Sequence, residues 1–324
     1  MANEYVLAAD VGGTNLRIAA VTSDGSIVCQ VTEPTPQTGA ADDVTDAISR
    51  VAESCVADSR TGTRPAAFGL ALAALVSVRE GRALSSPNLP ELNGLFLANT
   101  LSERLDLPVV LENDATAAAI GEYWLGSSNA VENSVFVTIG TGIGGGLILD
   151  GRVYRGVDGT AGEIGHICVE PDGVSCGCGS HGCVEQYASA TAMVRIAEEL
   201  ARQNAGSPLS ARARFTSKDV YDAAVAGDAV ALGTFRTMGR YLGIALAGLV
   251  DVLNPELIVI GGGAAAGWDF FIEHVRSEIQ TRAFRDPATR VQIVRASLGE
   301  AAGILGAARV ALDSVAERAR RSAM

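Results

Sequence analysis

The sequence contains a single lysine, Lys218, among its 324 residues. A P-loop requires a lysine directly after glycine, and a protein-kinase fold requires one on a strand near its glycine-rich loop, so the sequence excludes both. If the protein handles a nucleotide triphosphate, the phosphates must be held by backbone amides, hydroxyl groups and a metal ion.

Long apolar runs, a basic leader and an excess of positive charge are also missing. No run approaches the roughly 20 apolar residues of a membrane span. The opening stretch MANEYVLAADVGG has no basic region before its strand pattern, so we expect no signal peptide and no membrane partner. The net charge of −12 argues against a nucleic-acid partner. Cys29, Cys55 and Cys168 are irregularly spaced, and without an export signal we expect a reducing cytoplasmic location.

The length and the 48% hydrophobic content predict two domains, at about 150 residues each. Strands are expected at residues 6–9, 16–22 and 26–31, with a glycine loop after the first and an Asp24-Gly25 turn after the second. The same series returns at 134–140 and 147–149, where a second turn follows at Asp150-Gly151. This weak internal repeat predicts two related domains around a cleft.

Further elements are expected between and after these two series. Strands are predicted at residues 67–72, 109–112 and 257–260. A helix is predicted over 42–57, another after Asp114, and a last one over 301–319.

One stretch, GEIGHICVEPDGVSCGCGSHGCVEQ, has the residues of a closed zinc site. His166, Cys176, Cys178 and Cys183 supply three thiolates and one imidazole, which is a complete tetrahedral set for a structural zinc ion. The alternative is three unpaired cysteines in a flexible loop. His181 is interpreted as an exposed loop residue, because His166 better anchors the loop to the rest of its domain.

Several polar residues near predicted strand ends have two interpretations. Glu163 and Glu185 flank the metal motif and are not needed to complete it, so they are available for another role beside it. Asp114, at a strand-to-helix junction, is either an N-cap or a general base. Asn88 is either a turn residue or an amide presented to a polyol.

Two glycine-rich loops follow predicted strands. In AADVGGTNLR, amides after the strand and the Thr14 hydroxyl suit a phosphate, and Asp10 suits its metal ion; a β-turn without ligand is the alternative. The run GTGIGGG contains G-x-G, but a dinucleotide-binding fold needs a helix directly after the loop. Here the strand-like LILDGRVY follows, so a phosphate-binding hairpin is the better interpretation.

Taken together, these motifs resemble the ROK family of sugar kinases and sugar-responsive repressors, within the actin-like ATPase superfamily. DVGGTNLR and GTGIGGG are similar to its two phosphate motifs, END at 112–114 to its catalytic segment, and GVDGTAGEIGH with CGCGSHGCVE to its signature. GGG at 261–263 resembles its adenosine-side loop. The resemblance spans essentially the whole chain.

The resemblance implies an α/β fold of two actin-like (ribonuclease-H-like) domains with a central cleft and a structural zinc site. The domains would be 1–118 plus 302–324, and 119–301 with the zinc loop at about 163–185. It also implies an enzyme that phosphorylates a hexose with ATP and Mg²⁺. We expect it to act on glucose, giving glucose 6-phosphate, and to form a homodimer or higher homo-oligomer.

The resemblance assigns roles to individual residues. Asp114 would be the general base, and His166 would bind zinc through one ring nitrogen and sugar through the other. Sugar contacts would come from Asn88, Asn113, Asp114, Glu163, His166 and Glu185. Nucleotide contacts would come from Asp10, Gly12, Gly13, Thr14, Gly140, Thr141, Gly142, Gly262 and Gly263.

Two departures from the family pattern concern the choice of sugar. Thr116 stands where the family usually has a second asparagine, and Ala73-Ala74-Leu75-Val76 replaces a Gly-x-Pro-Gly stretch. N-acetylmannosamine, N-acetylglucosamine, mannose and fructose are therefore alternative substrates, and polyphosphate is an alternative donor. A non-catalytic sugar sensor is the alternative of another class. Family repressors carry an N-terminal helix-turn-helix domain, which we do not expect here because the sequence opens on the predicted strand.

Overall fold

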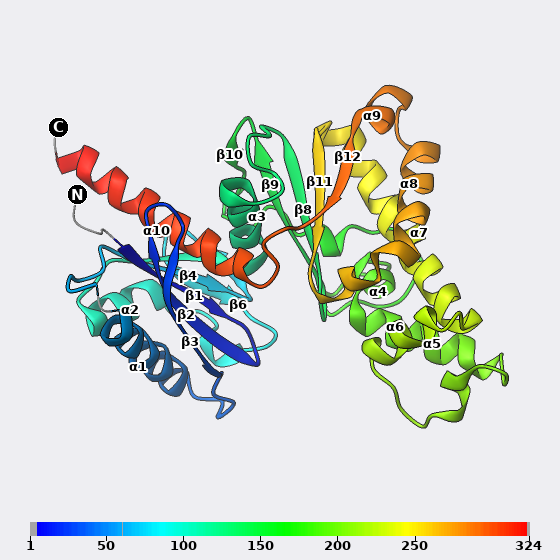
Figure 1. Cartoon of the computed structure of the whole chain (residues 1–324), viewed down its shortest axis with the longest axis horizontal. Helices are drawn as coiled ribbons and strands as arrows, with labels where there is room; N and C mark the ends of the chain where they lie inside the picture. Colours follow the sequence, from blue (N-terminus) through cyan, green and yellow to red (C-terminus); the bar gives the residue numbers. More distant parts are fainter. Residues whose placement is uncertain (1–4, 60, 323–324) are drawn as a thin grey trace. The chain divides into compact units, whose positions relative to one another are not determined.

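The computed structural model describes residues 5–59 and 61–322 (Figure 1). Alternate side chains of its first strand, β1 (Tyr5–Val11), belong to two different hydrophobic cores. The odd-numbered side chains pack with α1 (Ala41–Ser59) and α2 (Leu97–Leu105). Val6 and Ala8 pack with α3 (Asp114–Leu125) and α10 (Ala301–Ser322). The two-residue period of the strand thus produces a sheet with helices on both faces.

The first sheet has the strand order β3-β2-β1-β4-β7. The antiparallel strands are β1, β2 (Asn15–Thr22) and β3 (Ile27–Pro34), and β4 (Phe68–Leu72) and β7 (Val109–Asn113) continue it in parallel. A small antiparallel sheet, β5 (Leu75–Ser77) with β6 (Arg82–Ser85), follows β4. The helix α10 approaches α3 closely, because a Cβ atom on Gly306 would lie 1.6 Å from the Ala117 carbonyl oxygen.

The second sheet has the order β10-β9-β8-β11-β12. Its strands are β8 (Ser134–Ile139), β9 (Ile143–Leu149), β10 (Arg152–Val153), β11 (Leu257–Gly261) and β12 (Gln292–Arg295). The helices of this part of the chain are α4 (Glu185–Ala188), α5 (Ala190–Arg202), α6 (Ser217–Val225), α7 (Ala229–Leu253), α8 (Trp268–Arg282) and α9 (Arg285–Arg290). The long helix α7 packs along α8.

The two five-stranded sheets have equivalent strand orders, which confirms the internal repeat. In each, the strand after the glycine loop leads into an Asp-Gly turn: Gly25 has φ +88°, and Asp150 and Gly151 have φ +51° and +69°. The strands predicted at 67–72, 109–112 and 257–260 are present within one residue at each end. The helices predicted at 42–57 and 301–319 are also present, but they end two and three residues further on, at Ser59 and Ser322. The α/β class is therefore confirmed.

Contacts divide the chain into two compact units. The first comprises the residues up to Ala130, Gly146–Gly162, and those from Ser297 on; the second comprises Val131–Gly145 and Glu163–Ala296. Helix α3 belongs to the first unit because it packs against α10. The expected boundaries at 118/119 and 301/302, and the cleft between actin-like domains, stay predictions. Among the helices of the described chain, none combines the length and apolar character that crossing a bilayer requires.

Candidate functional site

Asp114 is the first residue of α3, directly after β7. Asn113 is the N-cap: its Oδ1 accepts from the Thr116 amide at 2.9 Å. Its Nδ2 donates to Asp114 Oδ1 at 3.0 Å and to the Ala74 carbonyl oxygen at 3.1 Å. The N-cap role that the sequence left open for Asp114 thus belongs to Asn113, which holds the Asp114 carboxyl at the helix N-terminus, where a negative charge is favoured.

This geometry bears on the sugar contact predicted for Asn113. An amide has two N–H donors and an acceptor oxygen with two lone pairs. Both Asn113 donors already bond within the protein, and Thr116 occupies one lone pair of the oxygen. Asn113 can therefore bind a ligand only by accepting a hydrogen bond at the second lone pair of Oδ1. The predicted sugar contact stays a prediction.

The first glycine loop, Gly12 to Thr14, has its three carbonyl groups bonded to the segment 35–37. Thr35 donates to the Gly12 and Thr14 oxygens, at 2.7 and 3.0 Å, and Gln37 Nε2 donates to the Gly13 oxygen at 2.6 Å. Within residues 5–59 and 61–322, the amides of Gly13 and Thr14 donate no hydrogen bond to the protein. Backbone amides left in this state suit an anion.

Asn88 lies against this loop. A Cβ atom on Gly13 would come within 2.7 Å of the Asn88 Cβ, so only glycine permits the approach. The exposed Asn88 side chain follows Ser86, whose buried hydroxyl donates to the Ala73 oxygen at 2.9 Å and accepts from the Leu89 amide at 3.1 Å. The turn that carries Asn88 is thereby fixed beside the first glycine loop.

Asp10, at the end of β1, lies 3.6 Å from an Arg17 nitrogen, and Arg17 also pairs with Glu300 at 3.0 Å. Burial raises the pKa of Asp10; the Arg17 guanidinium opposes this shift and Glu300 adds to it. The carboxyl also faces the first turn of α10, because a Cβ atom on Gly303 would lie 3.5 Å from its Cγ. Asp10 is thus a carboxyl that a cation would stabilise in its ionised form.

The second glycine loop, Gly140 to Gly142, is built like the first. The carbonyl oxygens of Gly140, Thr141 and Gly142 accept, in that order, from the Ala190 amide, the Thr191 hydroxyl and the Gly140 amide, at 2.8 to 2.9 Å. In the described chain the amides of Thr141 and Gly142 donate no bond within the protein. As predicted, a strand, β9, follows this loop rather than a helix.

Glu185 braces the second glycine loop. Its Oε2 accepts from the Ile143 amide at 2.9 Å and would lie 2.3 Å from a Cβ atom on Gly142.

The predicted adenosine-side loop lies at the end of β11. There Gly262 has φ +86°, and a Cβ atom on it would come within 2.5 Å of the Ile139 backbone, so this position requires glycine; Gly263 is exposed.

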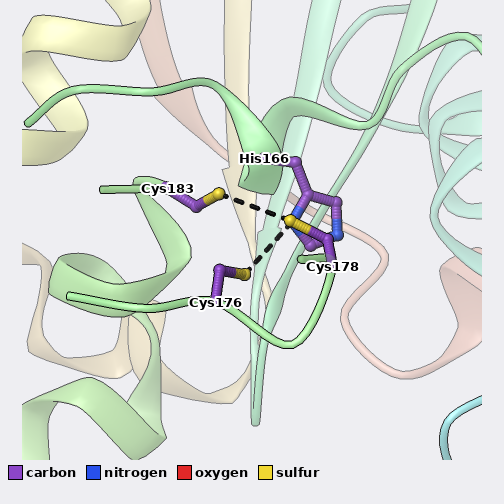
Figure 2. Close-up of side chains that lie close together, drawn as sticks. All are labelled: His166, Cys176, Cys178 and Cys183. Atoms are coloured by element: carbon purple, nitrogen blue, oxygen red, sulfur yellow. Dashed lines mark hydrogen bonds between the residues drawn. The ribbon is translucent and has the colours of Figure 1, made fainter. Parts of the chain in front are cut away.

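His166, Cys176, Cys178 and Cys183 converge on one point, with their ligand atoms all within 4.8 Å of one another (Figure 2). His166 ends a 3-10 turn at Ile164–His166, and the cysteines lie on a hairpin closed by the Cys176 amide, which donates to the Ser180 oxygen at 2.8 Å. Gly182 fits this hairpin only as glycine, because its Cβ atom would lie 1.6 Å from the Glu170 carbonyl oxygen. His181 is exposed and outside the cluster, as expected.

The separations within this cluster suit zinc. Zinc–sulfur and zinc–nitrogen bonds of about 2.3 and 2.05 Å at tetrahedral angles place two sulfurs about 3.8 Å apart and a nitrogen about 3.6 Å from a sulfur. Cys178 Sγ and Cys183 Sγ are 3.7 Å apart, and His166 Nδ1 is 3.6 Å from Cys176 Sγ. Burial and the neighbouring thiols raise the pKa of Cys183 to about 12, so three thiolates would coexist here only around a cation.

The other ring nitrogen of His166 faces a carboxyl group. Its Nε2 lies 3.9 Å from Glu163 Oε2, and both side chains are partly exposed. Partial burial raises the pKa of Glu163, His166 opposes this, and Glu185 adds to it. Glu163, His166 and Glu185 therefore form one polar group in the second unit, while Asn88, Asn113 and Asp114 belong to the first.

One interaction beside Asp114 was missed from the sequence. Glu112 is 1% exposed and pairs with Arg155, whose Nη2 lies 2.6 Å from Glu112 Oε2. A glutamate in the apolar strand VVLEN requires a buried partner, and this was the available signal. The partner itself, 43 residues away, was not identifiable from the pattern.

Comparisons with known proteins place this site in context. A family model described as ROK family matches residues 6–314. The chain is 35% identical to a glucokinase of Halalkalibacterium halodurans over 312 residues, 94% of each chain. It is 34% identical to a glucokinase of Thermotoga maritima over 318 residues, 96% of this chain and 98% of the other.

Two solved structures resemble the chain closely. A ROK family glucokinase from Streptomyces griseus, in complex with glucose and AMPPNP, aligns with a TM-score of 0.81 at 34% identity, covering 95% of this chain and 99% of that one. A ROK family transcriptional regulator, a homologue of the Escherichia coli MLC protein, aligns with a TM-score of 0.87 at 29% identity. That match covers 94% of this chain and 77% of the regulator.

Proposed function

Because the chain belongs to the ROK family and is a hexokinase-type phosphotransferase, we propose that it transfers the γ-phosphoryl group of ATP to the 6-hydroxyl of glucose. The observation that carries this proposal is near full-length similarity, at 34–35% identity, to glucokinases. A similar structure that holds glucose and AMPPNP supports both the sugar and the donor.

The two glycine loops are proposed to bind the ATP phosphates. Each has three carbonyls bonded back to the protein and free amides at its tip. With one lysine in the chain, at an exposed position paired with Asp222, charge neutralisation falls to these amides, the Thr14 hydroxyl and Mg²⁺ held through Asp10. The turn at Gly262 and Gly263 is proposed to lie beside the adenosine.

Asp114 is proposed to accept the proton of the attacking sugar hydroxyl. In-line phosphoryl transfer depends mainly on positioning and on charge neutralisation, and a well-placed base contributes about 10²–10⁴-fold. The Asn113 amide orients the Asp114 carboxyl, and the N-terminus of α3 favours its ionised form. Asn88, Glu163, His166 and Glu185 are proposed to bind the other hydroxyl groups of the sugar.

The four-residue cluster is proposed to hold a structural zinc ion through His166 Nδ1 and the thiolates of Cys176, Cys178 and Cys183. When bound, the ion fixes the fold of this loop and the tautomer of His166. His166 Nε2, on the Glu163 side of the ring, then carries the proton and donates to a sugar oxygen.

A non-catalytic sugar sensor is the second candidate function, because the chain resembles a transcriptional regulator with a TM-score of 0.87. The glycine loops and Asp114 favour the kinase. Sugar binding without ATP turnover would favour the sensor instead. A homo-oligomeric assembly, polyphosphate as donor and the cytoplasmic location stay predictions.

A hexose panel tests the proposal. Formation of the sugar phosphate by the purified protein is measured with Mg²⁺-ATP and with glucose, mannose, fructose, N-acetylglucosamine or N-acetylmannosamine. The same product is measured in a parallel series in which polyphosphate replaces ATP. We expect the highest kcat/KM with glucose and ATP. A higher kcat/KM with another sugar would show that this sugar, rather than glucose, is the preferred substrate. No turnover with any sugar would refute the proposal that the protein is a sugar kinase.

A further inference from the structure

A buried ion pair lies one residue from the proposed catalytic segment. Glu112, in β7, is 1% exposed, and Arg155 follows β10 and is 30% exposed. Arg155 Nε and Nη2 both reach Glu112 Oε2, at 2.8 and 2.6 Å. The other oxygen, Oε1, accepts from the Asn113 amide at 3.1 Å. Both carboxylate oxygens of Glu112 are therefore occupied.

The hydrogen bonds of this ion pair connect to Asp114, the proposed base, through Asn113. Arg155 binds Glu112, Glu112 binds the backbone amide of Asn113, and Asn113 Nδ2 binds Asp114 Oδ1 at 3.0 Å. Asn113 is also the N-cap that starts α3. A displacement of Glu112 would thus reach the backbone that orients Asp114.

Stability alone is a poor reason for this pair. Burial raises the pKa of Glu112, which Arg155 opposes, so the carboxylate is costly to keep ionised inside the fold. Replacement of a buried ion pair by apolar residues is often neutral or stabilising. Unlike apolar packing, an ion pair forms hydrogen bonds of defined direction. The Glu112–Arg155 pair can therefore fix the position of the backbone segment to which Glu112 belongs.

Arg155 also begins the loop that leads to the family signature. Its carbonyl oxygen accepts from the Ala161 amide at 3.1 Å, which closes the loop on itself. Gly159, with φ +89°, lies against β5, since its Cβ atom would be 3.2 Å from the Val76 oxygen. The chain then runs directly into Glu163 and His166. Arg155 therefore fixes the start of this loop as well as the strand end at Glu112.

We propose that Arg155 is a positioning residue for phosphoryl transfer, which acts through Glu112 to hold Asn113 and the Asp114 carboxyl in the reactive arrangement. The inference rests on the proposed function. Arg155 acts through Glu112 and is not proposed to contact the reacting atoms. Its loss lowers kcat, because a misplacement of about 1 Å at a reacting group costs on the order of 10²-fold.

The test compares Arg155→Met, Arg155→Lys, Glu112→Gln and the double variant Glu112→Gln/Arg155→Met with the wild type. Arg152→Met is the matched control, since Arg152 lies three residues away on β10 and is exposed. The kcat, the KM for glucose, the KM for ATP and the Tm are measured for each. Normalising kcat to the folded fraction separates positioning from stability.

We expect Arg155→Met to lower kcat about 10²-fold and to change the KM for ATP less than about twofold. Arg155→Lys keeps the charge but not the paired N–H geometry, so its kcat should lie between that of the wild type and that of Arg155→Met. The double variant should be no slower than Arg155→Met, because both single changes break one link. Arg152→Met should keep the wild-type kcat.

Other outcomes overturn the inference. These are wild-type kcat in Arg155→Met and Glu112→Gln, an additive loss in the double variant, or an equal loss in Arg152→Met. If Arg155→Met fails to fold, Arg155→Lys and Glu112→Gln decide by the same criteria. A wild type without turnover on any hexose would refute the proposed function and this inference together, whereas normal variants beside an active wild type refute this inference alone.

Discussion

At the scale of single residues, Asp114 derives its proposed role from Asn113. The Asn113 side chain caps α3, bonds the Ala74 oxygen and orients the Asp114 carboxyl, so one amide sets both the helix start and the base. The sequence motif END identifies the segment. Which of its last two residues caps the helix and which is available as the base depends on the directions of the two side chains.

Asp114→Asn should lower kcat about 10²–10⁴-fold, because the amide keeps the shape but cannot accept the proton. Glucose affinity, measured by calorimetry, should change only a few-fold. Asp43→Asn, an exposed position in the first turn of α1, is the control and should leave kcat unchanged. Near-normal turnover in Asp114→Asn would contradict the assignment of the base.

Asp10 makes a prediction about pH. The pKa of Asp10 in the folded protein lies above its ordinary value of 3.8, because the effect of burial outweighs that of Arg17, so the fold favours the protonated carboxyl. The resulting stabilisation is present below pH 3.8 and is lost as the pH rises through the folded pKa. Near neutral pH the ionised Asp10 therefore reduces stability, as functional carboxylates often do.

Asp10→Asn should accordingly raise the Tm near neutral pH, and the gain should vanish toward pH 3.8. At the same time the KM for Mg²⁺-ATP should rise, since a proposed metal-binding carboxylate is lost. Thermal unfolding across this pH range checks the first result, with exposed Asp58→Asn as the control. A lower Tm for Asp10→Asn near neutral pH would contradict the prediction.

At the scale of elements, the cysteine hairpin and the 3-10 turn of His166 have little apolar material of their own. Cys178 and His166 are exposed, so backbone hydrogen bonds such as the one from the Cys176 amide to the Ser180 oxygen hold the hairpin while these two side chains face solvent. A metal ion would add the cross-link between these side chains that apolar packing does not supply. The proposed sugar contacts Glu163, His166 and Glu185 lie on either side of this hairpin in sequence.

Cys176→Ala should lower the zinc content and the glucose affinity together, because three ligands hold zinc less tightly and His166 loses its fixed orientation. Zinc is measured by atomic absorption and glucose by calorimetry on the same preparations. Cys168→Ala, in the same segment but outside the cluster, should change neither. Full affinity in zinc-free protein would refute the structural role of the metal.

At the scale of the whole molecule, Glu122 joins segments about 175 residues apart. It is completely buried, and none of the salt bridges among the described residues includes it. Oε2 accepts from the Ser127 amide at 2.7 Å and the Ser297 hydroxyl at 3.2 Å, and Oε1 accepts from the Leu298 amide at 2.8 Å. Ser297 is where the chain re-enters the first unit before α10.

Glu122→Gln should lower the free energy of unfolding by about 2 kcal/mol or more. Both Glu122 oxygens receive donors, so the new amide NH₂ faces a donor whichever way it points. Glu132→Gln, at an exposed position, should change the free energy of unfolding by less than about 0.5 kcal/mol. Urea titration measures both, and equal stability of the two variants would show that this buried carboxyl is dispensable.

Local rules determine the glycine loops, the paired strand series and the cluster of one histidine and three cysteines. For that reason the linear order of residues was enough to predict where they lie. Strand periodicity, the need for glycine at positive φ and the donor set of zinc each involve residues that are close in sequence. The dinucleotide interpretation of GTGIGGG was excluded in the same way, by the strand that follows it.

The partners of buried charges could not be predicted, because they depend on which distant segments the fold brings together. Arg155 meets Glu112 across 43 residues and Glu122 meets Leu298 across 176, and no periodicity encodes either pair. The direction of the Asn113 amide, with Asp114 beside it rather than at the cap, is likewise a result of packing. Local sequence limits the roles that a residue can have, and long-range contacts determine which of these roles it takes. In this protein they determine how Asp114, the proposed base, is oriented.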